Sequence, residues 1–279
     1  MPTKPHKKAN TIYYISRPIV IGRVNWIGFF TLYWREVMRF LKILGQTIIA
    51  PMVTVWLFLA IFTVAIGERG SFTLGGEVGL QLFLAPGLVI MASLQNAFAN
   101  SSTSLVVGKV QGNIVDLIMP PLSPSEVCVA TLLAGVTRGV VVATATIISL
   151  VVFGVLPAIA HWGVMVYFLV IASAIMTALG LIAGIWADKF DDLASISNFI
   201  VQPLVFLSGT FYSIDRLPAP FDTLALYNPV FYMIDGFRAG VIGVASVSVW
   251  FGGAVLMACL LVLAGCAHHL LTIGYKLKN

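Results

Sequence analysis

The chain has 279 residues, of which 59% are apolar and only 10% are Asp, Glu, Lys or Arg, with a formal net charge of +5. Soluble domains carry about 45–50% apolar and about 25% charged residues, so this chain has too little charge to cover a water-exposed surface. The composition excludes an ordinary soluble globule and indicates lipid as the solvent. The cysteines lack CxxC spacing, which excludes a disulfide framework or a zinc knuckle and favours small buried hydrophobes: Cys128, Cys259 and Cys266.

The chain begins with a basic N-terminal segment, residues 1–25, followed by an amphipathic stretch over residues 26–44. In that stretch Arg35, Arg39 and Lys42 recur at i, i+4 and i+7, and aromatic and aliphatic residues occupy most other positions. The pattern is typical of a helix that lies in the membrane interface. The alternative is a plain extension of the first span. The first charge-free stretch is too long for a signal peptide, so we expect the N-terminus to be retained.

Six uncharged or nearly uncharged stretches follow, each long enough to cross a bilayer, because about 20 apolar residues in a helix cover ~30 Å of hydrocarbon. Pro157, His161 and Trp162 mark a turn that divides one long apolar run into two spans. We expect one transmembrane domain over residues 45–273 and a tail over 274–279. Its predicted spans are residues 45–67, 78–108, 127–156, 162–187, 193–214 and 247–273.

The positive charges sort onto one side of these six spans. Most of the 16 Lys and Arg lie at the N-terminus, in the loops after the second and fourth spans, or in the C-terminal tail. The opposite side carries only three of them: Arg69, Arg216 and Arg238. Because cytoplasmic loops are enriched in Lys and Arg, both termini are predicted to be cytoplasmic.

The sequence carries no recognisable catalytic, nucleotide or metal motif. Its one Gly-Lys pair, Gly108 and Lys109, is followed by Val110 instead of Ser or Thr, so there is no P-loop. His268 and His269 are adjacent, and on a helix they point about 100° apart, unlike paired metal ligands. We therefore expect no catalytic residue, no metal and no cofactor on this chain, and no ATP hydrolysis by the chain itself.

Arg138 is the one fixed charge inside a predicted span. A charge at that depth costs about 2.5–3.5 kcal/mol on insertion scales unless it is paired or reaches the interface. Two roles remain open. The side chain hydrogen-bonds an amide of the second span (Gln95, Asn96 or Asn100), or it contacts the polar head of a substrate.

The predicted cytoplasmic loop over residues 109–126 contains a short amphipathic segment. Residues 112–119 are expected to form a helix, which Pro120, Pro121 and Pro124 end. Its apolar side chains favour contact with a partner. The alternative is that the segment folds under the bundle.

The outer segment over residues 209–243 is too apolar for a solvated loop and is interrupted by prolines. Asn228 is expected to cap a helix that begins at Pro229 and places Asp235 and Arg238 at i and i+3. Broken, aromatic-rich helices at this depth favour a re-entrant element that covers the outer mouth. An ordinary aromatic belt is the alternative.

The F-Y-S, L-P, Y-N-P and D-G-F-R strings within residues 209–238, together with D-L-I-M-P-P-L-S-P-S-E after the second span, resemble the permeases of type-2 ABC exporters. The resemblance covers almost the whole chain. It implies an all-α membrane subunit of the bacterial inner membrane with six transmembrane helices, an interfacial helix, a coupling helix and a re-entrant outer element. It also implies a second copy of this permease and two copies of a separate ABC ATPase that binds ATP and Mg.

By the same resemblance, the ATPase would contact two cytoplasmic loops, through Gln111, Gly112, Asn113, Ile114, Asp116, Leu117, Ile118, Met119, Asp191 and Asp192. The translocation path would run between spans one, two and five of both copies. We expect its polar lining to come from Gln46, Thr54, Gln95, Asn96, Asn100, Arg138, Asn198, Gln202 and Ser208. The outer gate would comprise Phe211, Tyr212, Tyr227, Asn228, Pro229, Asp235 and Arg238.

A lining of amides, hydroxyls and apolar groups suits an amphiphilic, lipid-linked or glycan-type substrate, or a drug, better than a small ion. Two other classes stay open. An ion-gradient-driven carrier or channel predicts intramembrane carboxylates or sequence repeats, neither of which is evident. A membrane-embedded transferase needs a site with clustered His and carboxylate groups. The pair His268 and His269 is the only hint of such a site in the sequence.

Overall fold

The computed structural model describes residues 22–66, 71–73, 77–156, 158–212 and 225–276. Helices dominate it, with one short antiparallel hairpin in which Phe72 pairs with Val78. The first elements are α1 (Trp26–Leu41), the short π-helix η1 (Gly45–Ile49), α2 (Ala50–Ile66), β1 (Ser71–Thr73), β2 (Glu77–Gly79), α3 (Leu80–Val110) and α4 (Val115–Ile118). The others are α5 (Pro124–Val152), α6 (Trp162–Trp186), α7 (Phe190–Ile196), η2 (Ser197–Val201), α8 (Gln202–Phe206), α10 (Pro229–Ile242) and α11 (Val249–Ile273).

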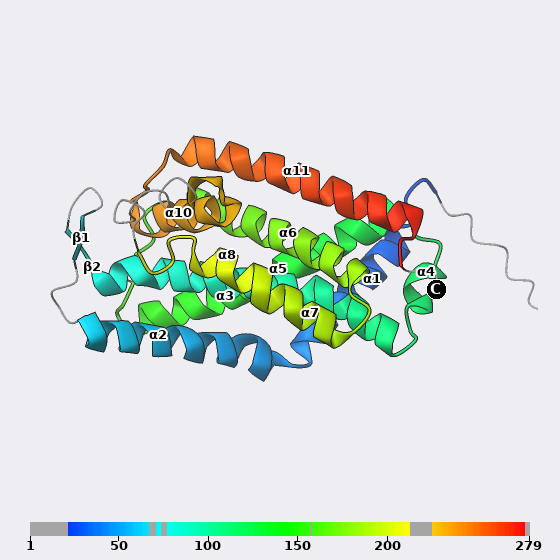
Figure 1. The fold of residues 1–279 in the computed structure, drawn as a ribbon, viewed down its shortest axis with the longest axis horizontal. Coiled ribbons are helices and arrows are strands. Elements are labelled where there is room, and N and C mark those ends of the chain that lie inside the picture. Colours follow the sequence, from blue (N-terminus) through cyan, green and yellow to red (C-terminus); the bar gives the residue numbers. More distant parts are fainter. Residues whose placement is uncertain (1–21, 67–70, 74–76, 157, 213–224, 277–279) are drawn as a thin grey trace, which may run out of the picture.

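The long helices form an elongated bundle whose axis runs along the length of the molecule (Figure 1). Within the described residues, 5 helices are long and apolar enough to cross a membrane: Gly45–Ala65, Leu80–Val110, Pro124–Val152, Trp162–Trp186 and Val249–Ile273. The structure therefore confirms a helical chain with multiple apolar helices, each overlapping a predicted span.

The predicted span over residues 193–214 differs in the structure. It is a helical stack of α7, η2 and α8 that begins at Phe190 and ends at Phe206. Three residues after the helix ends, Gly209 adopts a left-handed conformation with φ of 75°, which redirects the chain. The hydroxyl of Tyr212 donates to the free carbonyl of Leu207 at 2.6 Å. The stack is thus shorter than expected, and the chain turns back near Gly209.

Helix α1 is amphipathic, as predicted, and packs along α5. The side chain of Asn25 caps it by accepting a hydrogen bond from the Gly28 amide at 2.9 Å. Its opposite face exposes large apolar side chains, namely Trp26, Ile27, Phe30 and Trp34. An exposed apolar face is what a membrane interface would cover.

The loop after α3 contains a helix of only 4 residues, α4. It is shorter than the predicted 112–119 segment because Gly112 has a left-handed φ of 73°, which keeps the first residues out of the helix. The next helix begins with a capping box between Ser123 and Glu126, with Pro124 in the first turn. The prolines therefore end one helix and start the next.

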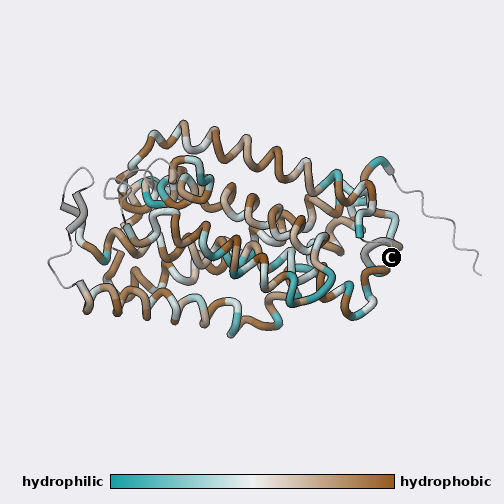
Figure 2. Tube along the Cα trace, in the orientation of Figure 1, coloured by the Kyte–Doolittle hydropathy of each residue, from teal (hydrophilic) through white to brown (hydrophobic). Residues whose placement is uncertain are grey.

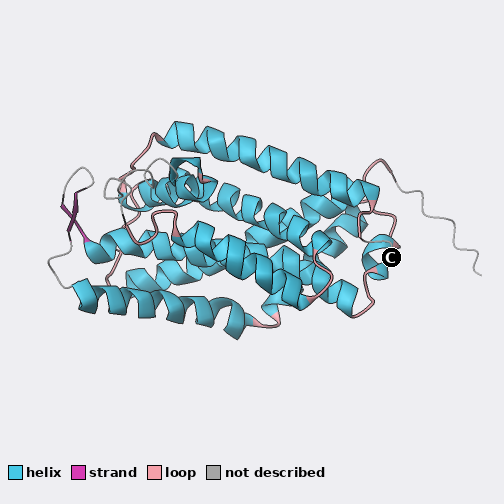
Figure 3. Ribbon diagram, in the orientation of Figure 1, coloured by secondary structure: helices cyan, strands magenta, loops and turns pink. Residues whose placement is uncertain are grey.

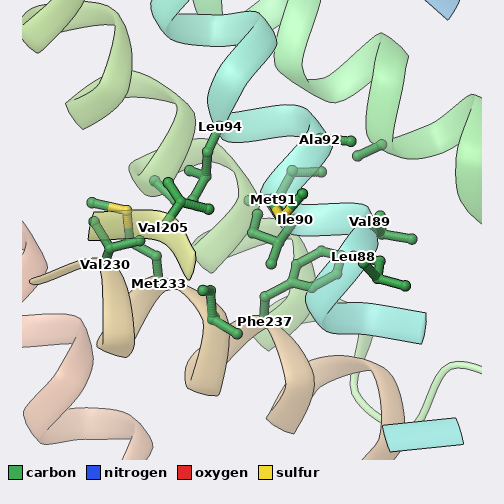
Figure 4. Close-up of a cluster of buried hydrophobic side chains, with 14 of the residues drawn as sticks. Leu88, Val89, Ile90, Met91, Ala92, Leu94, Val205, Val230, Met233 and Phe237 are labelled. Atoms are coloured by element: carbon green, nitrogen blue, oxygen red, sulfur yellow. The ribbon is translucent and has the colours of Figure 1, made fainter. Parts of the chain in front are cut away.

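The interior of the bundle lies around α3 and α6, which pack along each other. Close approach is possible because small residues line the contact. A Cβ on Gly180 would lie 2.3 Å from the Phe98 carbonyl oxygen, a distance that real structures do not allow. Figure 4 shows the large apolar side chains of α3, including Leu88 and Leu94, beside Val205 of α8 and Phe237 of α10. The short elements α8 and α10 thus belong to the packed interior.

The two ends of the bundle differ in charge. We call one the basic end, since it carries Arg35, Arg39, Lys42, Lys109, Lys189 and Lys276. Helix α4 and the end of α11 lie there, whereas the hairpin and α10 lie at the opposite end, which we call the hairpin end (Figure 1). Hydrophilic residues gather near the basic end, whereas α2, α6 and α11 are brown over most of their length (Figure 2).

Candidate functional site: a polar pocket beside α2

A pocket of about 290 Å³ lies between η1, α2, α3 and α5. It brings together five residues that the sequence assigns to the translocation path: Gln46, Thr54, Gln95, Asn96 and Arg138. The rest of its lining is apolar and includes Val55, Phe58, Leu88 and Met91. A mixture of amides and apolar groups around one cation can hold the polar part of an amphiphile.

Arg138 enters this pocket from α5. Its Nε and Nη2 donate to Oδ1 of Asn96 on α3, at 3.2 and 2.9 Å. The guanidinium carbon lies 6.0 Å from the centre of the Phe40 ring. Asn96 is one of the three amides that the sequence offers as a partner, so α3 and α5 are joined at this point by a charge-assisted hydrogen bond.

A second amide contact extends the polar surface toward α8. Nε2 of Gln95 donates to Oε1 of Gln202 at 3.1 Å, which joins α3 to the start of α8. Asn198 lies one turn earlier, on η2, and is exposed. Gln202 is thus linked to the pocket through Gln95, whereas neither Asn198 nor Ser208 is among the residues that line it. Ser208 is buried beyond α8, where it accepts a hydrogen bond from Nδ2 of Asn228 at 2.7 Å.

Asn100, also expected on the path and as a partner of Arg138, binds another arginine. Nη2 of Arg39 donates to the backbone oxygen and to Oδ1 of Asn100, at 2.5 and 3.2 Å. The reason is its position on α3, one helical turn closer to the basic end than Asn96 and opposite α1. Asn100 therefore does not line the pocket and instead contributes to the contact between α1 and α3.

Glu36 completes that contact and was not singled out from the sequence. Its carboxylate is 3% exposed and accepts hydrogen bonds from Arg39 at 3.0 Å and from the hydroxyl of Ser104 at 2.9 Å. The sequence signal for this contact is a single acid among the cations of an amphipathic helix. Buried carboxylates need such partners, so Glu36 fixes α1 against α3.

The predicted coupling residues border a second pocket, of about 410 Å³, between α1, the end of α3 and the following loop. Its lining includes Gln111, Asn113, Ile114 and Asp116. Gly112 is exposed beside it, and Met119 is 78% exposed. The side chains of Leu117 and Ile118 lie outside the described part of the structure. The loop thus offers accessible apolar and polar groups at the basic end.

The second predicted coupling loop lies at the same end. Oδ2 of Asp192 accepts hydrogen bonds from the backbone amides of Asp188 and Lys189, at 3.0 and 3.1 Å, and so caps α7. Asp191, its neighbour in the first turn, is exposed. Asp191 is therefore available to a partner, whereas Asp192 has a local structural role.

Asp188 connects three helix ends in this region. Its carboxylate accepts a hydrogen bond from Nζ of Lys276, after α11, at 2.7 Å, and lies 3.9 Å from Nζ of Lys109 on α3. The hydrogen bond from Lys276, aided by the nearby cations, holds the pKa of Asp188 below its usual value. The same bond raises the pKa of Lys276. The ends of α3, α6 and α11 are thereby held together.

At the hairpin end, Asn228 caps α10 as predicted. Its Oδ1 accepts from the Val230 amide at 3.0 Å, and Pro229 occupies the first turn. Its Nδ2 donates to the carbonyl of Leu204 at 3.0 Å, which fixes α10 against the end of α8. Tyr227, the preceding residue, is exposed.

Asp235 and Arg238 are both buried, yet each has a different main partner. Asp235 accepts hydrogen bonds from the Ser246 and Val247 amides between 2.9 and 3.1 Å. Nη2 of Arg238 donates to the Gly209 carbonyl at 2.7 Å, and its guanidinium lies 4.0 Å from the Phe83 ring centre. Their i, i+3 spacing thus supports two separate contacts, one to the start of α11 and one to the turn after α8.

Aromatic rings close the surface between α2 and this turn. Phe211 stacks on Phe62 of α2 with ring centres 5.1 Å apart and on Phe206 of α8 at 5.5 Å. The remainder of the predicted outer element, residues 213–224, lies outside the described residues. In the described part, the turn after α8 therefore contacts α2 through Phe211 and α10 through Arg238.

Comparisons with known proteins agree with this architecture. Residues 27–242 match the family described as ABC-2 type transporter. The inner membrane transport permease YadH of Escherichia coli K12 is 35% identical over 226 residues, which cover 80% of this chain and 86% of that protein. Nodulation protein J of Rhizobium leguminosarum biovar viciae is 24% identical over 171 residues, covering 60% of this chain and 64% of that protein. The resemblance seen in the sequence is confirmed: this chain belongs to the ABC-2 type transporter family and is a multi-pass membrane permease subunit.

Proposed function

We propose that this chain is the membrane subunit of an ATP-driven exporter of the bacterial inner membrane, which moves an amphiphilic, lipid-linked or glycan-type substrate or a drug. The pocket beside α2 is the observation that carries the proposal, because it holds amides, a hydroxyl and a cation among apolar side chains at the depth of the spans. An ionisable side chain within a span is expensive, and a pocket where it meets a few other polar groups is the default candidate for a substrate site. YadH, by its name, is a transport permease of the inner membrane.

A second copy of the chain would cover the exposed side of this pocket. Gln46 and Thr54 are exposed in the single chain and belong to the same helical stretch, Gly45–Ala65. The Thr54 hydroxyl already donates to the Ala50 carbonyl, but an exposed amide is unfavourable against hydrocarbon, so another protein surface or a water-filled path has to face Gln46. Two copies meeting across α2, with the substrate passing between them and along α3 and α8, satisfy both requirements.

Energy would come from two copies of an ABC ATPase that bind ATP and Mg and dock at the basic end. The positive charge of this end supports a cytoplasmic position for it and for both termini. The loop over residues 111–119 and the exposed Asp191 would be the docking points, with α4 as the coupling helix. The contact from α1 to α3 through Glu36 would carry their movement to the pocket.

At the hairpin end, the turn after α8 and α10 would form a re-entrant outer gate. Arg238 fastens this turn to α3, and Asp235 fastens α10 to the start of α11. Phe211, packed on α2, would move when the two copies separate. The last crossing would be supplied by the α7, η2 and α8 stack together with this outer element, giving six spans.

The proposal is tested by reconstituting the chain with its ATPase in vesicles and measuring ATP hydrolysis and transport for a panel of lipids, glycans and drugs. Met119→Glu should abolish transport while the purified dimer stays folded, because a charge replaces an exposed apolar contact in the coupling loop. Val24→Glu is the control, since Val24 is also exposed at the basic end but lies outside both loops. Transport that persists without ATPase and ATP would overturn the proposal in favour of an ion-gradient carrier.

A further inference from the structure

Arg138 has an unusual electrostatic environment for a residue at this depth. Its side chain belongs to a residue that is only 8% exposed, and it lines the pocket beside α2. None of the ion pairs among the described residues involves Arg138. Its partner, Asn96, is neutral, and Nη1 makes no hydrogen bond within the described part of the chain. The guanidinium therefore keeps its charge without a counter-ion from these residues.

The neighbouring groups do not supply that counter-ion. The pocket is lined by amides, a hydroxyl and apolar side chains, with no carboxylate among its described residues. The charged side chain that acts on Arg138 from α1 is another cation, Arg39. Arg39 already has its own acid, Glu36, at 3.0 Å. The pocket is therefore a positive site in a low-dielectric environment, where an unpaired charge is most unfavourable.

We propose that the pocket binds an oxyanion, a carboxylate or a phosphate, of the transported molecule, and that Arg138 is its counter-ion. This inference rests on the proposed export function and narrows its substrate class to acidic amphiphiles. An oxyanion accepts charge-assisted hydrogen bonds from a guanidinium, and the amides of Gln46 and Gln95 are further donors in the same lining. Asn96, which accepts two hydrogen bonds from Nε and Nη2, orients the guanidinium and leaves Nη1 for the ligand.

The rival explanation is that Arg138 only braces α5 against α3 through Asn96. The two explanations differ in what they require of the charge. A brace needs hydrogen-bond donors, which a glutamine also has, whereas an anion site needs the positive charge itself. An acid at position 96 would separate them most sharply, because Asn96→Asp keeps the contact with Arg138 but gives it an internal counter-charge.

The experiment measures equilibrium binding of radiolabelled probes to the purified full chain in phosphatidylcholine nanodiscs, without any ATPase. The probes are laurate, dioctanoyl phosphatidic acid and inorganic phosphate, with neutral dodecanol as the reference. Empty nanodiscs correct for partition into lipid. Because no ATP is involved, failure of this test leaves the coupling experiment unaffected, and failure of ATP-driven transport leaves this test unaffected.

We expect wild type to prefer at least one of the two acidic amphiphiles to dodecanol. Arg138→Gln and Asn96→Asp should each weaken that binding about tenfold, or about 1.4 kcal/mol, whereas Arg138→Lys should retain most of it. Lys42→Gln, which removes an exposed cation just after α1, should leave it unchanged. Preference for laurate would identify a carboxylate; preference for phosphatidic acid, with or without free phosphate, would identify a phosphate on a lipid or in solution.

Equal binding of dodecanol and both acidic amphiphiles by wild type would overturn the inference. So would unchanged acidic-probe binding in a folded Asn96→Asp variant, which is the result that the brace alone predicts. If Arg138→Gln does not fold, the wild-type preference and the Asn96→Asp variant still decide the question.

Discussion

Helices α2 and α6 have the same hydropathy and opposite surroundings. The most apolar 18-residue stretch of each has a mean hydropathy of 2.4. In α6, 83% of that stretch is buried inside the chain, whereas in α2 only 11% is buried. Helix α11, with a hydropathy of 2.3, resembles α2, since 17% of its corresponding stretch is buried. Figure 1 places α2 and α11 at opposite edges of the bundle, with α6 between them. Hydropathy therefore identifies a span but not its neighbours.

Small residues at the contacts with neighbouring helices distinguish α6 from α2. Lipid tails are as apolar as leucine, so helices in membranes associate through close packing and hydrogen bonds, not through a hydrophobic driving force. Helix α6 presents Ser173, Thr177, Gly180 and Gly184 to its neighbours. Helix α2 contains no glycine, and Thr54 bonds its own helix at the Ala50 carbonyl. Helix α2 is thus free to contact another surface.

The largest expected effect comes from filling the tightest contact. Gly180→Leu forces a side chain into the Phe98 carbonyl and should lower the free energy of unfolding by about 3 kcal/mol. Gly265→Leu on α11 is the matched control, because nothing lies within 4 Å of the Cβ it would introduce. Thermal unfolding in detergent compares the two. Equal losses at both sites would contradict the distinction between interior and peripheral helices.

Next in size is the polar contact that holds the peripheral helix α1 against α3. Glu36→Ala removes the buried carboxylate that Arg39 and Ser104 contact and should cost about 2–3 kcal/mol. Arg35→Ala, at a half-exposed partner of the same carboxylate, should cost less than about 1 kcal/mol. The same unfolding measurement ranks them. A larger loss at Arg35 would show that the network is held from its exposed side.

A smaller effect is expected at the cap of α10. Asn228→Ala removes the bond to the Val230 amide and those to Leu204 and Ser208, and should cost about 1–2 kcal/mol. Tyr227→Ala, at the exposed neighbour, should be close to neutral. Retained stability in Asn228→Ala would mean that packing alone holds α10 in the interior.

The smallest effect concerns the exposed pair that anchors the end of α11. Because the pKa of Asp188 is lowered in the folded chain, the pair stabilises above the unfolded pKa of an aspartate, and the contribution is lost as the pH falls through the lowered value. The melting temperature of Asp188→Asn should therefore lie slightly below that of wild type at pH 7. At acidic pH, below the lowered pKa, the two melting temperatures should be the same. A constant difference at every pH would exclude the ion pair as its cause.

Much of this architecture follows from the sequence. Apolar length predicts α3, α5, α6 and α11, and the Asn-Pro pair at residues 228–229 predicts the start of α10, because these signals are local. The contact between Arg138 and Asn96 was predictable because a charge in a span requires a polar partner.

Other features depend on long-range packing and escape such reasoning. The helix expected to reach residue 214 ends at Phe206, because its terminal carbonyls bind Tyr212 and Asn228. Asp235 binds the start of α11 instead of pairing with Arg238, and Asn100 binds Arg39 on a helix about 60 residues earlier. Spacing along one helix does not predict partners that another segment supplies.

Cysteine cross-linking in vesicles that contain the permease and its ATPase tests most directly whether two copies meet across α2 to form an ATP-driven path. In a background without Cys128, Cys259 and Cys266, Leu57→Cys probes the exposed face of α2 and Leu261→Cys that of α11. We predict a cross-linked dimer at Leu57 and none at Leu261, with ATP-dependent transport lost on oxidation and restored on reduction. A dimer formed only through Leu261, or transport unaffected by the Leu57 cross-link, would contradict this arrangement.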